Sequence, residues 1–452
     1  MQNQIRATTP AEAFWTLDPF ALINPGDPWH SEIEARFKPS RYGLVSQITR
    51  RLMPNPAAPP YVHIGVVGHR GTGKTTQVRK AMVGLARVGV HAVFVDALAA
   101  FDQSDLSFTD VMLVIADAVV GGLGEDVEIP AAELELVKLW FTEELLTETH
   151  RKELLGTLET EAKVSGGLPW LAQLTAKVTA VFKSHNEYRQ EIRRRAERDP
   201  SDLIRRVNLL LDAAAAALTR KLDARTTLCV VVDNLEKLTD RRQVDAAVLR
   251  RAEEFRQLRS HLALFFDPAD QYAPTTVQPS QAFETVTVPM LPIRERGDAP
   301  DHVDATALAA VRELLDRRVA LDRVFSLADA CVLEAARLSG GRLRDVFATA
   351  RLACELADPD PVTPDHFLSA ARKLRGERVV AAKPGQWQRL AEVHRDKQVA
   401  NDENDAHLLL HSLVLNYDGD PWWDVHPLVR LDPRFDETWQ RLSSVTTKPH
   451  LA

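Results

Sequence analysis

The chain has 452 residues, an ordinary apolar fraction of 45% and a formal net charge of -7. This length allows two or three domains, each with its own core. The acidic balance argues against a protein whose whole surface binds nucleic acid or membrane, and it leaves room only for a local basic patch.

Cysteine content and hydropathy indicate where the protein works. Cys229, Cys331 and Cys354 have no paired or metal-ligand spacing and lie in apolar stretches, which predicts small core residues in a reducing compartment. The first residues lack a basic-then-apolar signal pattern, and no stretch approaches the ~20 apolar residues of a membrane span. We therefore expect a cytoplasmic protein.

Residues 1–60 are rich in proline and contain one predicted helix between Arg41 and Met53. Proline removes backbone donors and interrupts regular structure. We expect a lead-in segment that is draped over the domain that follows.

A phosphate-binding pattern follows this segment. It reads Gly68-His69-Arg70-Gly71-Thr72-Gly73-Lys74-Thr75-Thr76, which is glycine, any four residues, glycine, lysine and a hydroxyl residue. The apolar run Tyr61–Val67 before it predicts a buried parallel strand, and Gln77–Val88 after it has helical spacing.

This context gives each residue of the loop a predicted role. The three glycines let the backbone wrap round a polyphosphate, with N–H groups and the helix dipole directed at the anion. Lys74 would reach the β- and γ-phosphates, and the Thr75 hydroxyl would bind Mg²⁺. ATP and Mg²⁺ are therefore the expected ligands.

The next elements extend an α/β pattern. His91–Val95 predicts a second buried strand, and Phe108–Val120 predicts an apolar helix. Strands that alternate with helices imply a parallel sheet with right-handed crossovers.

Pro130 to Arg225 reads as a helical insertion, because it is far longer than an ordinary crossover. Within it, the stretch Tyr188–Arg206 is dense in arginine, and Asp199-Pro200 reads as a helix cap followed by a first-turn proline. The arginines are either a contact surface for phosphate or an acidic partner, or a solvated face interleaved with carboxylates.

A third strand, Thr226–Asn234, ends in Asp233, where an acidic residue that organises Mg²⁺ is required. Glu236, three positions later, is a plausible base for the attacking water. His261–Phe266 should form the strand beside the phosphate-binding one. Asp267 at its tip either senses the γ-phosphate or begins a turn with Pro268.

Glu284–Pro289 completes five predicted strands and a doubly wound sheet. Helical periodicity then predicts four helices with short turns. They span Asp304–Ala320, Ser326–Ser339, Arg342–Leu356 and Thr363–Leu374.

Arg344, near the start of the third of these helices, could be directed at a bound phosphate. The alternative is that Arg342 and Arg344 only pair with Asp345 or other carboxylates.

From Gln386 the sequence predicts two helices and a hairpin, with strands at Leu413–Tyr417 and Trp422–Val425 around a turn at residues 418–420. This order suggests a small winged-helix module. Acidic residues outnumber basic ones there, so a protein contact is expected in preference to DNA. Trp422 and Trp423 read as exposed aromatics.

Three motifs give the chain a family resemblance. They are the phosphate loop, Asp233-Asn234-Leu235-Glu236 and Ser339-Gly340-Gly341-Arg342-Leu343-Arg344-Asp345. With them the chain resembles bacterial P-loop ATPases of the AAA+/STAND group, those with an origin-recognition-like helical lid and a terminal winged helix. The resemblance implies that Lys74 and Thr75 bind nucleotide and Mg²⁺, that Asp233 organises the metal and that Arg344 is the lid arginine called sensor 2. In many such ATPases the lead-in segment covers the adenine, and Phe20 or Trp29 either does so here or is an ordinary packing residue.

The expected domains are a lead-in segment (1–60), an ATPase core (61–295, with an insertion at 130–225), a helical lid (296–378) and a winged-helix-like module (379–452). Two features depart from the family pattern. Asn234 stands where many AAA+ ATPases have the catalytic glutamate, which favours slow or partner-regulated turnover. No pattern selects a trans-acting arginine finger among Arg294, Arg296, Arg317 and Arg318.

The leading hypothesis is an ATP-dependent switch that hydrolyses ATP, engages a protein partner or assembles with copies of itself, and by family association serves bacterial defence. Its expected catalytic set is Glu236, Asp233, Lys74 and Arg344. The alternatives are a DNA-associated ATPase of the initiator, loader or transposition-regulator type, and a scaffold that binds ATP with negligible turnover. Salt-dependent DNA binding that is lost with Arg193, Arg194 and Arg195 would favour the DNA-associated reading.

Overall fold

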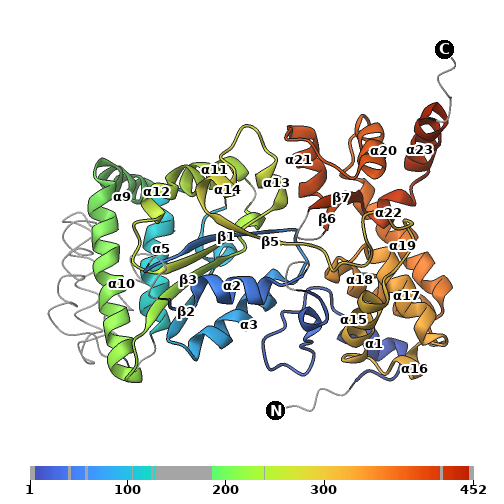
Figure 1. Cartoon of the computed structure of the whole chain (residues 1–452), viewed down its shortest axis with the longest axis horizontal. Helices are drawn as coiled ribbons and strands as arrows, with labels where there is room; N and C mark the ends of the chain where they lie inside the picture. The colour runs from blue at the N-terminus through green and yellow to red at the C-terminus, as the bar shows by residue number, and fades with distance from the viewer. Residues whose placement is uncertain are drawn as a thin grey trace.

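The computed structural model describes residues 6–38, 42–55, 60–103, 105–123, 127, 186–238, 240–417 and 421–446. A sheet with its covering helices forms one end of the molecule, and a helical region forms the other (Figure 1). The predicted insertion between 130 and 185 and the hairpin turn at 418–420 lie outside the described residues.

The fold is α/β, with one five-stranded parallel sheet in the order β2-β3-β4-β1-β5. The strands are β1 (His63–Gly68), β2 (Val90–Asp96), β3 (Thr227–Asp233), β4 (His261–Phe266) and β5 (Glu284–Val288). All five strands predicted from the sequence are present. β4 lies beside β1, as expected, and the doubly wound arrangement is confirmed.

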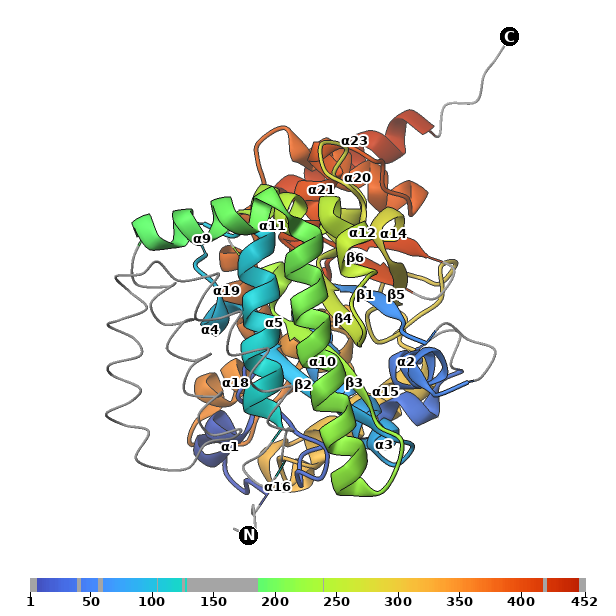
Figure 2. The same cartoon turned by 90° about the vertical axis from the view of Figure 1, so that its left-hand side faces the viewer.

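Alternate residues of each strand face opposite layers, as the pleat requires. On one face, Val230 and Val232 pack with α5 (Phe108–Gly122) and α10 (Pro200–Leu222). On the other face, Cys229 and Val231 pack with α2 (Leu44–Leu52) and α3 (Lys74–Ala86). Figure 2 shows α5 and α10 side by side over their face. Two covered faces explain why the strands read as continuous apolar runs.

Short elements complete this part of the chain. They are α4 (Ala97–Ala100), η3 (Leu235–Lys237), α11 (Arg241–Ala247), η4 (Leu249–Arg251), α12 (Ala252–Phe255), α13 (Pro268–Gln271) and α14 (Pro279–Ala282). All three cysteines are buried and free, as expected.

The arginine-rich stretch forms α9 (Asn186–Arg198) and the start of α10, and the Asp199 side chain caps α10 as predicted. Both readings of its arginines are wrong for Arg189 and Arg193, which are buried. Arg193 Nη1 lies 2.7 Å from Asp105 Oδ1, and Arg193 also pairs with Asp110. Burial favours pairing of such cations within the fold, so these two arginines fix α9 against the core.

The helical region contains the four predicted helices, α15 (Ala305–Asp316), α17 (Ala328–Ser339), α18 (Leu343–Ala357) and α19 (Pro364–Val379), with a short α16 (Leu321–Val324). The N-terminal segment belongs to it as well. The unpredicted helix α1 (Pro10–Thr16) packs on α18, and Ala7 forms a parallel bridge with Val319. The segment then crosses to the core through η1 (Ile33–Arg36) and α2.

The C-terminal part contains α20 (Gln386–Asp396), α21 (Glu403–Leu410), β6 (Val414–Tyr417), β7 (Trp422–Val425), α22 (Pro427–Arg430) and α23 (Pro433–Thr446). β6 and β7 form the predicted antiparallel hairpin. The expectation that Trp422 is exposed is wrong, because its ring is buried and stacks on Tyr417 at 4.4 Å. Among the described helices, none is both long and apolar enough to cross a membrane.

Candidate functional site

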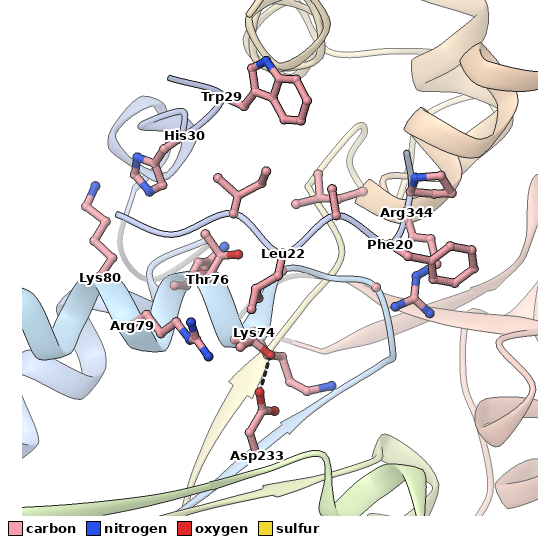
Figure 3. Close-up of a pocket in the computed structure, with 18 of the residues that line it drawn as sticks. Phe20, Leu22, Trp29, His30, Lys74, Thr76, Arg79, Lys80, Asp233 and Arg344 are labelled. Carbon is pink, nitrogen blue, oxygen red and sulfur yellow. Dashed lines mark hydrogen bonds between the residues drawn. The ribbon is translucent and has the colours of Figure 1, made fainter. Parts of the chain in front are cut away.

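A cavity of about 500 Å³ lies between the carboxyl ends of the strands and the helical region. Its lining includes Lys74 and Thr75 from α3, Asp233 from β3, Arg344 from α18 and residues 18–23 of the N-terminal segment (Figure 3). This volume is typical of pockets that bind small ligands, and the position is where open α/β sheets bind theirs.

The phosphate loop is shaped by its glycines. Gly71 and Gly73 have φ angles of 87° and 88°, which side chains on L-residues disfavour. A Cβ on Gly68 would lie 2.8 Å from Val288 Cβ, so only glycine lets β1 end this close to β5. The loop therefore turns sharply from β1 into the first turn of α3, where free N–H groups attract anions.

Lys74 is almost fully buried at the start of α3. Its ammonium donates to the carbonyl oxygens of Gly68 and His69, the second at 3.0 Å. It also lies 3.2 Å from Glu236 Oε1. The lysine thus faces both the loop that would hold phosphates and the carboxylate proposed as the base.

Thr75 and Asp233 meet at the position expected for a metal. The Thr75 hydroxyl donates to Asp233 Oδ2 at 2.8 Å, the bond drawn in Figure 3. Burial is the main cause that raises the pKa of Asp233, and the Thr75 bond opposes it. A bound divalent cation would hold the carboxylate ionised.

This donor set fits Mg²⁺, which takes few protein oxygens and completes its shell with water and phosphate. The described residues contain no cluster of three or more His, Cys, Asp and Glu side chains that would enclose a metal alone. Thr75 and Asp233 are therefore the two side chains that could hold Mg²⁺ beside a bound polyphosphate.

Asn234 redirects the chain after Asp233. It has a φ of 65°, a left-handed conformation that asparagine tolerates better than most residues. Its side chain donates to Asp96 Oδ1 at 2.8 Å, away from Lys74. The turn brings the buried carboxylate of Glu236 back to Lys74. Glu236 therefore lines the cavity, although it stands two positions after Asn234, where many AAA+ ATPases have their catalytic glutamate.

On the opposite wall, two arginines have different surroundings. Arg342 pairs with Asp345 at 2.8 Å and donates from Nε to the Arg70 carbonyl oxygen. Arg344 lines the cavity, and its Nε has no hydrogen-bond partner among the described residues. Burial lowers the pKa of Arg344, with Arg342 adding to the effect. The expected pairing with Asp345 holds for Arg342, which leaves Arg344 to meet an anion.

The lid, which is the helical region from α15 to α19, contacts the phosphate loop directly through α18. The Arg344 N–H donates to the Gly71 carbonyl oxygen at 3.0 Å. A Cβ on Gly71 would lie 2.6 Å from Arg344 Cβ. Gly71 is therefore required both by its own backbone conformation and by the close approach of α18.

Asp345 joins the lid to the C-terminal part. It accepts from Arg378 at 2.8 Å and from His426 Nε2 at 2.7 Å, in addition to Arg342. His426 Nδ1 accepts from the Leu428 N–H, so the proton of the neutral ring is on Nε2 and is donated to Asp345. Burial lowers the pKa of His426 to about 3, which keeps the ring neutral near pH 7.

The N-terminal segment covers the cavity from the lid side. Phe20 and Trp29 both line it, and the Arg344 guanidinium lies 5.0 Å from the Phe20 ring (Figure 3). Trp29 lies under Arg318, which donates to the carbonyl oxygens of Thr16 and Asp18. Phe20 is thus beside the residue proposed to meet phosphate. Trp29 lies near Phe347, one helical turn beyond Arg344, since Arg318 also stacks on the Phe347 ring at 3.8 Å.

The remaining residues of the phosphate loop divide into two groups. Arg70 and Thr76 line the cavity together with Gly71 and Gly73. His69 and Thr72 are buried, and neither is part of the lining. The Thr72 hydroxyl donates to the His69 carbonyl oxygen, and His69 Nδ1 lies 3.5 Å from Ser412 Oγ. These two residues would serve a ligand through their backbone alone.

The structure decides between the two readings of Asp267 and narrows the candidate arginine fingers. Asp267 does not line the cavity, because its carboxylate is buried and caps α13 through the Ala269 N–H, with Pro268 in the first turn. This supports the turn-initiating reading. Of the four arginines considered as trans-acting fingers, Arg294 and Arg318 are buried within the chain. Arg294 pairs with Asp424. Neither can reach a neighbouring subunit.

The sequence analysis missed the cavity residues Arg79, Lys80, Leu314 and Phe347, and it considered Arg318 only as a trans-acting finger. Arg79 and Lys80 lie on α3, Leu314 on α15 and Phe347 on α18, so no shared motif joins the three helices. Helix α1, which holds the N-terminal segment on the lid, did carry a signal. Thr9 caps it, Pro10 occupies its first turn and Glu12 follows at the capping distance.

Comparisons with known proteins give distant structural similarities. Neither a protein-family model nor a curated protein sequence matches this chain. Among solved structures, it is similar to the Aeropyrum pernix ORC1 protein in complex with DNA (14% identity, 96% of this chain and 97% of that chain, TM-score 0.39). It is also similar to the Aeropyrum pernix ORC2 protein in ADPNP and ADP complexes (12% identity, 95% and 98%, TM-score 0.39). A third is a Walker-type ATPase of Pyrococcus abyssi (9% identity, 89% and 99%, TM-score 0.41). At these values the likeness carries no functional argument.

Proposed function

We propose that the chain is an ATP-binding and ATP-hydrolysing switch. The observation that carries this proposal is the convergence of four separate elements on one cavity. Lys74 and Thr75 come from α3, Asp233 from β3, Glu236 from η3 and Arg344 from α18. No single motif would place a lysine, a metal-binding pair, a carboxylate and a second cation round the same space.

The proposed reaction transfers the terminal phosphoryl group to water by positioning and charge neutralisation. The loop N–H groups and Lys74 bind the phosphates, and Arg344 meets the γ-phosphate from the lid. Mg²⁺ held by Thr75 and Asp233 would neutralise charge on the phosphate oxygens. Glu236 orients the attacking water and accepts its proton.

The Lys74–Glu236 ion pair suggests how binding prepares this step. When Lys74 turns to the phosphates, it leaves the Glu236 carboxylate, which then becomes available as a base. The close contact between Gly71 and Arg344 would pass the change in the loop to α18. Nucleotide state would then alter the lid, the C-terminal part and their contacts with a protein partner or another copy.

The experiment that tests this function compares wild type with Glu236→Gln. The variant keeps the size of the side chain and removes the base, so ATP affinity should be retained while Mg²⁺-dependent turnover falls by about 100-fold or more. Solution mass with and without ATP would be measured on both proteins. Negligible turnover in wild type would favour the scaffold hypothesis. Measurable turnover that is equal in wild type and variant would contradict the proposed role of Glu236.

The structure does not favour the DNA-associated alternative, because Arg189 and Arg193 are occupied by aspartates. Arg193→Ala would disturb the core, so a fair DNA test uses the exposed Arg194 and Arg198. The AAA+/STAND grouping, the winged-helix module and a role in bacterial defence are proposed on motif resemblance.

A further inference from the structure

A second, much smaller cavity lies behind Glu236. Its volume is about 10 Å³, close to that of one water-sized probe. Its polar lining comes from Glu236, Arg241, Asp267 and Asp270, and the rest is apolar. Glu236 is the one polar residue that lines both this void and the nucleotide cavity.

Two buried carboxylate oxygens at this void have no hydrogen-bond partner among the described residues, Glu236 Oε2 and Asp267 Oδ2. The other oxygens of the cluster are satisfied. Asp267 Oδ1 accepts from the Ala269 N–H at 2.9 Å, and Asp270 accepts from the Asp267 N–H and from Arg241. Glu236 Oε1 faces Lys74. A buried acceptor without a partner is unfavourable, so each of these oxygens favours a donor beside it.

We propose that one ordered water in this void donates a hydrogen bond to Glu236 Oε2 and another to Asp267 Oδ2, so that Asp267 is a positioning residue for Glu236 in hydrolysis. The inference rests on the proposed function. A water has two donors, and the void has room for about one water beside two unpaired acceptors. The role differs from direct contact with the γ-phosphate, because Asp267 does not line the nucleotide cavity.

The bridge becomes important when ATP binds. Lys74 is the cation that holds Glu236 in place, and phosphate competes for it. Once Lys74 has moved, the water bridge to the end of β4 would be the contact that keeps the Glu236 carboxylate directed at the attacking water. A carboxylate that rotates freely would lose the positioning on which phosphoryl transfer depends.

The charge at Asp267 is compatible with this arrangement. Burial and the neighbouring Asp270 raise the pKa of Asp267 to about 7, while Arg241 and Lys74 act in the opposite direction. Two ionised carboxylates beside one void would repel each other. A proton on Asp267 during part of the time at neutral pH relieves this repulsion, and the carboxyl can then donate to the same water.

The test uses Asp267→Ser and Asp267→Asn in the full chain. Serine is also a good N-cap and can still accept from the Ala269 N–H, but it lacks the second oxygen at the void. Asparagine keeps the cap and presents an amide to the void. We expect Asp267→Ser to lower kcat by about 10–100-fold, the range seen when a supporting hydrogen-bond partner is removed. ATP affinity and KM should stay within about twofold, and Asp267→Asn should recover most of kcat.

Asp240→Ser is the matched control, since Asp240 caps the short helix α11 through the Arg242 N–H at an exposed position. It should leave kcat unchanged. A loss of ATP affinity in Asp267→Ser would indicate contact with nucleotide and overturn the inference. Unchanged kcat in Asp267→Ser would also overturn the inference. The proposed function would still stand in that case if Glu236→Gln abolishes turnover in the same preparation. Wild type without Glu236-dependent turnover would overturn both.

Discussion

The two walls of the proposed nucleotide cavity are built in different ways. The core wall consists of the phosphate loop and the tip of β3, where backbone geometry and strand ends place the side chains. The lid wall is gathered from α15, α18 and the N-terminal segment. Asp345 of α18 pairs with Arg342 and accepts a hydrogen bond from His426 of the C-terminal part, so side-chain contacts hold this wall in place. A wall fixed by backbone geometry suits ligand binding. A wall held by side-chain contacts can rearrange, which suits movement that depends on the bound nucleotide.

The lid wall is connected to the C-terminal hairpin by several contacts. His426 donates to Asp345, and the Tyr417 hydroxyl donates to the Gly340 carbonyl oxygen at 2.8 Å. The Met290 N–H donates to the Asn416 carbonyl oxygen at 3.0 Å. Any movement of α18 on nucleotide binding would therefore act on these contacts with the hairpin.

Asp345→Ala should have the largest effect on stability, because it leaves the cations of Arg342 and Arg378 buried without their shared carboxylate. We expect the free energy of unfolding to fall by about 3–5 kcal/mol, measured by urea denaturation. Glu437→Ala, an exposed change on α23, should have little effect. Equal stability of Asp345→Ala and wild type would show that the lid wall does not depend on this cluster.

Arg344→Ala should lower the affinity for ATP more than the affinity for ADP, which distinguishes the roles of the two walls. The core wall is proposed to bind the phosphates shared by ATP and ADP, and Arg344 is proposed to meet the γ-phosphate. We expect ATP affinity to fall about 10-fold, the value of one charge-assisted hydrogen bond, and ADP affinity to change less. Calorimetric titration with both nucleotides measures this, and Arg323→Ala at an exposed position of α16 is the control. Equal losses for ATP and ADP would contradict the role.

Acid should destabilise the sheet and the cluster round Asp345 by a smaller amount. Burial lowers the pKa of His63 and of His261 to about 4, and that of His426 to about 3. Unfolded histidine binds a proton near pH 6.5, so the unfolded chain takes up protons that the folded chain does not. Stability should therefore fall as pH drops from about 6.5 towards 4, by roughly 1 kcal/mol or less for each histidine at pH 6.

Urea denaturation at pH 7 and pH 6 checks the sign of this effect. His426→Gln should make the free energy of unfolding depend less on pH, by the contribution of one histidine. His426 is the histidine that contacts Asp345 of the lid. A free energy of unfolding that rises at pH 6 would contradict the buried neutral state of these rings.

The core wall could be predicted from sequence because its residues are adjacent along the chain. A glycine pattern between a strand and a helix, and an apolar run that ends in Asp233, each specify local geometry. The turn at Asn234 explains why Glu236 reaches the same cavity.

The lid wall could not be predicted in the same way. Asp345 and His426 meet across 81 positions of sequence, and Arg318 meets Thr16 across 302. Such contacts depend on how whole helices pack, which a linear pattern does not encode. Asp267 is a local case. The sequence left open a γ-phosphate sensor or a turn that begins at Asp267-Pro268, and the capping of α13 supports the turn.

The most direct measurement of the central claim is binding of ATP with Mg²⁺ to wild type and to Lys74→Ala by calorimetry. Lys373→Ala, at an exposed position on α19, is the control. The account predicts one saturable site in wild type and in the control, and a loss of affinity of about 100-fold or more in Lys74→Ala. Unchanged ATP affinity in Lys74→Ala would contradict the assignment of this cavity as a nucleotide site.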